Sequence, residues 1–299
     1  MKAVARIKPV WNAERTGNRI WRRLRRERIG FTPVLLFAAG LIIAFIVLCA
    51  LVPQWITSYS PTKMDAASLL QPPSKTHWFG TDYFGRDVFS LVVYGSRDSL
   101  LIGLSSVVVG GIIGAGIGML SGYVGGWLDV IMMRLIEVLM TIPGILLALA
   151  IAAATGPSLT NIVLAISASA IPRYARVMRS QILSVKNRTF VLASRSVGSS
   201  SFRIFWKHVL PNSYVPFLVM ATIGIGTSIL AGSGLSFLGL GVVKEIPDWG
   251  TVLAQGRGYL TVAWWMCTFP GLAIALFVLA INSIGDYIRD VLDPRHSSR

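Results

Sequence analysis

The chain of 299 residues is 54% hydrophobic and only 14% charged, and its mean hydropathy is +0.64. Because soluble domains carry about 25% charged residues, this composition excludes an ordinary soluble globular protein and indicates a membrane protein. The net charge of +15 would also suit a nucleic-acid-binding protein, but apolar runs separate the basic clusters, so we expect no nucleic-acid partner.

The N-terminal part of the chain predicts a basic segment followed by a retained membrane helix. Residues 1–32 hold ten Lys and Arg, and we expect this segment to be cytoplasmic. Residues 33–53 form the first predicted transmembrane helix, because a hydrocarbon core about 30 Å thick needs about 20 apolar residues. The basic region and the apolar run are both too long for a cleavable signal peptide.

Residues 54–99 predict an extracytoplasmic segment that is held together by its own charges. Its second half carries acidic and basic side chains in near balance, namely Asp82, Arg86, Asp87, Arg97 and Asp98. Ion pairs and turn caps between such neighbours fix a loop locally. We therefore expect this stretch to have a structural role rather than to contact substrate directly.

Residues 100–289 predict five further spans, and the chain is therefore expected to be all-α with about six transmembrane helices. We expect these spans at about 100–122, 128–154, 157–177, 213–240 and 264–285. Pro143 should kink the third span, and the fourth is long enough if Arg173 and Arg176 extend to the membrane surface. The third and fourth runs could also form one re-entrant hairpin, although the Gly-Pro-Ser turn at 156–158 favours two spans.

Two features of these spans predict helix contacts. Gly110, Gly114 and Gly118 lie four residues apart and form a close-packing face, either for a helix of this chain or for a partner. Arg134 and Glu137 are three residues apart and can pair on one helix face. For this pair we favour a structural role over a substrate site, although acidic residues within membranes are functional candidates.

The distribution of Lys and Arg predicts that both termini are cytoplasmic. With six spans, the segments assigned to the cytoplasm hold 21 Lys and Arg, and those assigned to the outside hold 6. This asymmetry follows the positive-inside rule and would be lost if one span were removed. The tail, residues 290–299, is therefore expected on the same side as residues 1–32.

The most informative segment is the basic loop at residues 184–212, between the fourth and fifth spans. Residues 173–211 hold eight Lys and Arg and no acid. The pattern predicts two short helices separated by a break at Gly198. Such an element suits the docking of another protein, and a basic loop held by anionic lipid headgroups is the alternative.

This loop resembles the EAA motif of ABC importer permeases. In that motif a Glu-Ala-Ala triplet is followed by three residues, a glycine, nine residues and a short ending in Leu-Pro; the chain has the same spacing, with Leu192 in place of Glu and Ser194 in place of Ala. The resemblance implies that the loop couples the permease to its ATPase. The positions carried over are Leu192, Ala193, Ser194, Arg195, Gly198, Arg203, His208, Leu210 and Pro211.

A second stretch, residues 79–100, is similar to a signature of the C-type permeases of dipeptide and oligopeptide importers. It contains Gly-Thr-Asp and Gly-Arg-Asp triplets, and Leu91 stands where that family often has Arg. The signature positions are Gly80, Thr81, Asp82, Gly85, Arg86 and Asp87. Residues 235–241, 247–250 and 285–294 are also similar, so the resemblance extends from the first helix to the tail.

The resemblance implies a permease of the ABC type I importer fold in the inner membrane. Such a subunit lines a channel that passes di- or oligopeptides from an extracytoplasmic binding protein to the cytoplasm. It implies a second permease subunit of the B type, one or two cytosolic ABC ATPase subunits and surrounding membrane lipid. Because the sequence has no G-x-x-x-x-G-K-[ST] phosphate loop, ATP and Mg would bind to the ATPases. The chain itself is expected to bind no cofactor or metal and to have no catalytic residue.

Two other hypotheses stay open. The chain could serve an importer of the same family for nickel, glutathione or another small solute, or it could be a non-ABC structural or channel protein. Polar residues on the apolar helices are candidates for lining a path, although each also suits a helix–helix hydrogen bond. These residues are Ser105, Ser106, Thr141, Ser167, Ser169, Thr227, Ser228 and Asn282.

Overall fold

A computed structural model describes residues 33–292, so the predicted cytoplasmic segment 1–32 and the last seven residues of the tail lie outside the described part. Within that part the protein is helical and has no strand, only one isolated bridge between Thr81 and Asp87. The main helices are Pro33–Leu51, α2 (Val88–Val124), α3 (Gly126–Thr141), α4 (Gly144–Thr155), α5 (Leu159–Lys186), α6 (Thr189–Ser196), α7 (Ser201–Ile204), α8 (Val215–Leu235), α9 (Trp249–Gly256) and α10 (Trp265–Leu292). This confirms the all-α prediction.

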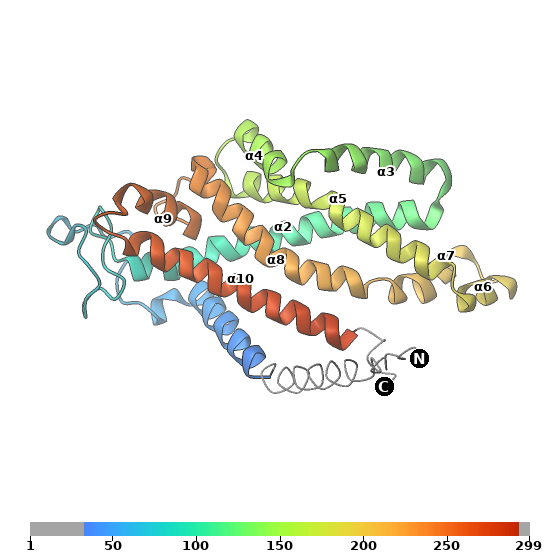
Figure 1. Cartoon of the computed structure of the whole chain (residues 1–299), viewed down its shortest axis with the longest axis horizontal. Coiled ribbons are helices and arrows are strands. Elements are labelled where there is room, and N and C mark those ends of the chain that lie inside the picture. The colour runs from blue at the N-terminus through green and yellow to red at the C-terminus, as the bar shows by residue number, and fades with distance from the viewer. Residues whose placement is uncertain (1–32, 293–299) are drawn as a thin grey trace, which may run out of the picture.

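The long helices form one elongated bundle. Figure 1 shows α2, α5, α8 and α10 along its long axis, with α9 and the loops before α2 gathered at one end and α6 and α7 at the other. The Pro33–Leu51 helix packs at the side of the bundle, where Ile46 contacts the apolar core that surrounds Trp249. We call the end with α9 the signature end and the end with α6 and α7 the loop end.

Hydropathy supports four of these helices as membrane spans on their own. Pro33–Leu51, α2, α10 and α8 continued to Leu240 are long and apolar enough to cross a membrane, and the bent α3–α4 pair would add a fifth. The helix α5 falls short in hydropathy because arginines occupy its second half, but its 28 residues are long enough to cross. With α5, the described residues contain the six long segments that the sequence predicted.

The third predicted span is broken rather than kinked. The helices α3 and α4 meet at 88°, and the residues between them are extended, with ψ of 127° at both Ile142 and Pro143. A proline disfavours the helical conformation of the residue before it and removes one backbone donor, so a helix that reaches Pro143 stops there. The sharp break places a stretch of non-helical backbone beside α5.

The predicted glycine face is used inside this chain. A Cβ atom added to Gly110 would lie 3.0 Å from the carbonyl oxygen of Ser167, and one added to Gly114 would lie 2.7 Å from that of Ile171. At Gly118 it would lie 2.8 Å from the Cβ atom of Met178. The backbones of α2 and α5 therefore lie in direct contact, as small residues four positions apart allow. Of the two hypotheses for this face, the contact within the chain is the one observed.

The helix α2 begins at Val88, twelve residues before the predicted start of the second span. The Asp87 carboxylate caps this end by accepting a hydrogen bond from the backbone N–H of Ser90 at 2.8 Å. The added turns are covered by α9, since the Trp249 indole N–H donates to the carbonyl oxygen of Val92 at 2.8 Å. Trp249 is 1% exposed and forms the centre of the signature end.

Candidate functional site

The basic loop forms two short helices around a glycine, as its pattern predicted. The helix α6 ends before Gly198, which has a φ of +84°, and α7 continues as a wider helical turn over Phe205–Val209. Val191 and Ile204 are buried and pack, with their neighbours, against the last turns of α5. One face of the loop is thus fixed to the bundle.

The base of the loop is also tied to the end of α2. The Lys186 ammonium donates to the backbone carbonyl of Tyr123 at 2.6 Å and lies 5.5 Å from the centre of the Tyr123 ring. The Tyr123 hydroxyl donates to the carbonyl oxygen of Ser201 in the loop. These contacts make the loop a direct continuation of the α2–α5 pair.

The opposite face of the loop presents apolar side chains to solvent. Val197 is 87% exposed, Phe202 74% and Trp206 54%. Of the positions carried over from the EAA motif, six are exposed and three are partly buried. The exposed ones are Leu192, Ala193, Arg195, Gly198, Arg203 and Pro211, and the partly buried ones are Ser194, His208 and Leu210. Exposed aromatic and aliphatic side chains gathered on one fixed element are typical of a protein-binding surface.

The signature at residues 80–87 is buried and bonded to other parts of the chain. The Arg86 guanidinium donates to the Asp82 carboxylate at 2.7 Å, and these side chains are only 6% and 2% exposed. It also reaches the carbonyl oxygen of Glu245 and the side-chain oxygen of Gln255, at 3.4 and 3.3 Å. The Trp265 indole N–H donates to the carbonyl oxygen of Thr81 at 2.9 Å. Arg86 therefore connects the signature to α9, and Thr81 connects it to α10.

The other predicted charges of this segment are also paired, except for one. The Asp87 carboxylate contacts Nδ1 of His77 at 3.0 Å, and the Lys244 ammonium donates to Asp98 at 2.7 Å. Arg97 is exposed and forms no ion pair with a described residue. Gly80 and Gly85 have φ of +72° and +74°, and a Cβ atom at Gly80 would lie 2.6 Å from the carbonyl oxygen of Gln71.

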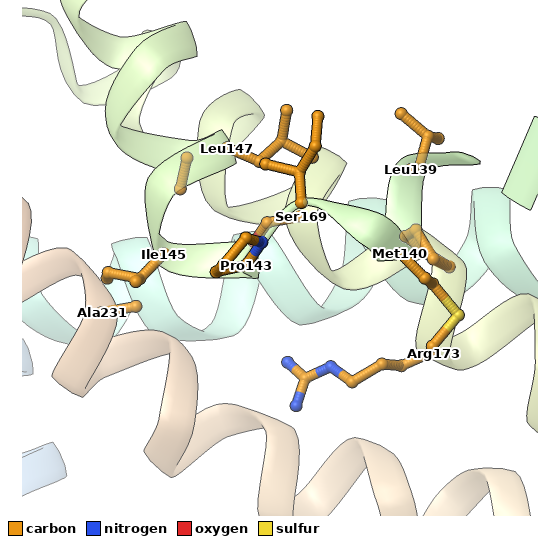
Figure 2. Close-up of a pocket in the computed structure, with 12 residues that line it drawn as sticks. Leu139, Met140, Pro143, Ile145, Leu147, Ser169, Arg173 and Ala231 are labelled. Atoms are coloured by element: carbon orange, nitrogen blue, oxygen red, sulfur yellow. The ribbon is translucent and has the colours of Figure 1, made fainter. Parts of the chain in front are cut away.

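A cavity of about 390 Å³ lies where α3 and α4 break, and it faces α5 and α8. Figure 2 shows the Arg173 side chain of α5 extending below Pro143, with Met140, Ile145 and Ala231 around the same space. Ser169, one of the candidate lining residues, also borders this cavity. Arg173, which the sequence predicts to extend to the membrane surface, lies midway along α5 and lines the cavity.

Most of the other candidate lining residues form helix contacts instead. The Ser167 hydroxyl donates to the carbonyl oxygen of Val163 at 2.6 Å, and Ser106 lies beside it in the α2–α5 contact. Thr141 and Thr227 donate to carbonyl oxygens of their own helices. Asn282 on α10 is different, because its buried side-chain oxygen has no hydrogen-bond partner among the described residues.

Two ion pairs join α3 to itself and to α5. Arg134 and Glu137 form the predicted pair at 3.1 Å, and both are exposed. The Arg179 guanidinium makes two hydrogen bonds of 2.6 Å to Asp129, which also accepts one from Ser121. The sequence does not predict this second pair, because fifty positions separate its members and no helical spacing connects them. No cluster of three metal-ligating side chains occurs in residues 33–292.

Residues 114–298 match the family described as "Binding-protein-dependent transport system inner membrane component". This chain belongs to that family. It is therefore an inner-membrane permease subunit of an ABC transport system and not a catalytic enzyme.

The relatives and the solved structures agree with this assignment. The chain is 43% identical over 257 residues to the probable D,D-dipeptide transport system permease protein DdpC of Escherichia coli K12, covering 86% of each chain. It is 40% identical to the glutathione transport system permease protein GsiD of Pectobacterium atrosepticum, covering 93% of this chain and 91% of that one. An inward-facing structure of the MetNI methionine ABC transporter matches with a TM-score of 0.57 and 22% identity, covering 68% of this chain and 97% of that chain. The structural match confirms the predicted fold.

Proposed function

We propose that this permease is the C-type subunit of an importer for di- or oligopeptides. The names of its dipeptide-transporting relatives and the signature at residues 80–87 support this substrate class. Glutathione is itself a short peptide, so a glutathione importer is the second candidate, and the relatives named for it favour it directly. A B-type permease, one or two ABC ATPases that bind ATP and Mg, and an extracytoplasmic binding protein complete the proposed complex.

The exposed apolar face of the loop is the observation that supports its proposed role in ATPase coupling. We propose that the loop end is cytoplasmic, as are both chain termini, and that Val197, Phe202 and Trp206 insert into the ATPase. The loop is anchored through Lys186 to the end of α2, so a movement of the ATPase would reach the bundle through a fixed element. Rocking of packed helices between two arrangements would then open the path to one side at a time.

Two equally exposed valines test this docking. Val197→Asp places a charge in the proposed contact, whereas Val243→Asp places one at the signature end; the wild-type side chains are 87% and 89% exposed. Burial of an unpaired charge opposes association, so we expect Val197→Asp to reduce ATPase copurification about tenfold or more and Val243→Asp to leave it unchanged. Equal recovery of ATPase with both variants would contradict the coupling role.

Uptake of radiolabelled dipeptide by vesicles that contain the complete complex tests the substrate class. We expect ATP-dependent uptake that an excess of unlabelled dipeptide blocks. Efficient uptake of glutathione or nickel, without uptake of dipeptide, would instead select the corresponding alternative.

A further inference from the structure

The cavity at the α3–α4 break contains a positive charge that none of the residues 33–292 neutralises. Arg173 lies near the middle of the 28-residue helix α5 and lines the cavity. Two other arginines have carboxylate partners on α3, since Arg179 of α5 pairs with Asp129 and Arg134 of α3 pairs with Glu137. Arg173 forms no ion pair with any residue between 33 and 292. An ionised side chain within a membrane span is costly and is usually retained for function.

The backbone around Arg173 indicates that the cavity holds water. Residues 142 and 143 are not helical, and non-helical backbone within a membrane is tolerated only where protein covers it or a water-filled cavity borders it. Pro143, Gly144 and Ile145 all line the cavity. The first backbone N–H groups of α4 have no acceptor within their helix, so they add to the positive potential without defining the site by themselves.

The size and the walls of the cavity suit part of a small organic anion. Its volume of about 390 Å³ lies within the range of small-molecule pockets, about 300–1,000 Å³. Met140, Ile145 and Leu147 provide apolar walls that can hold a side chain, as Figure 2 shows around Pro143. A guanidinium group binds a carboxylate through two parallel hydrogen bonds, which fixes the orientation of the anion.

We propose that Arg173 binds the carboxylate of the transported solute as it passes the α3–α4 break. The inference rests on the proposed function, because a short peptide with a free C-terminus brings such a carboxylate. The apolar walls beside Arg173 would then contact the last side chain of the peptide. An acidic residue of the second permease subunit that pairs with Arg173 is the competing explanation.

The local charge can be measured through Ser169. In a chain with Cys49→Ala and Cys267→Ala, Ser169→Cys would carry the only thiol, at the edge of the cavity. The complete complex in nanodiscs is labelled with an anionic and with a cationic methanethiosulfonate, and the ratio of the two rates is recorded. Removal of one nearby charge should lower this ratio about tenfold in Arg173→Gln. Arg176→Gln is the matched control, since Arg176 is exposed on the same helix but does not line the cavity.

Peptide protection identifies the occupant. Millimolar dipeptide with a free carboxylate should slow labelling of Ser169→Cys, and the same dipeptide with an amidated C-terminus should not. Arg173→Gln should abolish the protection, whereas Arg173→Lys should retain the rate ratio and weaken the protection. Equal protection by the acid and the amide, or an unchanged ratio in Arg173→Gln, would overturn the proposal.

The same measurements separate the competing explanations. If an acid of the second permease already neutralises Arg173, the wild-type ratio will be close to that of Arg173→Gln, and the proposal fails. If the complex takes up no dipeptide but a high ratio is seen and another carboxylate-bearing solute protects, the anion site stands and only the peptide assignment fails.

Discussion

The two ends of the bundle differ in how far their large apolar side chains are exposed to solvent. At the signature end, Arg86 and Asp82 are almost fully buried and bonded to each other, and Trp249 is 1% exposed. At the loop end, the apolar Val197 and Phe202 are 87% and 74% exposed. The signature end buries Trp249 and the Arg86–Asp82 pair within this chain. The loop end leaves these side chains exposed, and the proposed function assigns the ATPase to cover them.

The largest effect is expected at the signature end, when its buried ion pair is broken. Arg86→Ala leaves the Asp82 carboxylate buried without its partner, which typically costs about 3–5 kcal/mol of folding free energy. Arg97→Ala, at an exposed arginine of the same region, should change the stability by less than about 0.5 kcal/mol. Thermal unfolding of the purified subunit in detergent measures both. A small effect of Arg86→Ala would show that the signature end does not depend on this pair.

Two glycines with the same backbone conformation compare the ends directly. Gly85 and Gly198 have φ of +74° and +84°, so alanine at either position incurs a cost of about 1–2 kcal/mol from the left-handed conformation. At Gly85 the added Cβ atom would also collide with the backbone of Asp65, whereas at Gly198 it would meet nothing within 4 Å. We therefore expect Gly85→Ala to cost about 1–3 kcal/mol more than Gly198→Ala. Equal melting temperatures of the two variants would remove this distinction.

The smallest effect concerns two carboxylates of the signature end with opposite pH dependence. Burial raises the pKa of Asp248, although the Thr251 hydroxyl and the Gly250 N–H donate hydrogen bonds to it. A group with a raised pKa binds more protons in the folded state, so its contribution to stability falls as the pH rises through the folded-state pKa. Asp248→Asn should thus gain stability relative to the wild type as the pH rises through that pKa.

Asp65 is the control for the direction in which stability changes with pH. Hydrogen bonds from the Ala67 N–H and the Ser68 hydroxyl lower the pKa of this exposed carboxylate. Its contribution to stability is therefore present at neutral pH and is lost as the pH falls through the folded-state pKa. Asp65→Asn should lose stability relative to the wild type as the pH rises, which is opposite to Asp248→Asn. Parallel pH profiles of the two variants would contradict these assignments.

The sequence predicted the helices well because a membrane span needs a long apolar run and little else. It placed the break at Gly198 and predicted ion pairs among the charges of residues 82–98, since both depend on neighbours a few positions apart. It did not predict the first turns of α2, because their polar residues are typical of a loop. In the structure these turns are covered by Trp249, which is 150 or more positions away in the sequence.

The parts of the candidate site that the sequence did not reveal depend on tertiary contacts. Pro143 predicts some disruption, but the 88° angle follows from the packing of α4 on α5. The predicted span ends at residue 177 and the helix α5 continues to Lys186, so no local pattern showed that Arg173 lies midway along this helix. The Asp129–Arg179 pair joins two helices whose mutual orientation no local pattern encodes.

The glycine contact between α2 and α5 has a mechanical consequence. Side chains at an ordinary helix interface can change rotamer and absorb a displacement, but a contact of backbone against backbone has nothing that can yield in this way. The 28 residues of α5 span about 42 Å. We expect α2 and α5 to move together as one rigid body. A push received beside Lys186 would then arrive almost undiminished at Leu159, at the other end of α5.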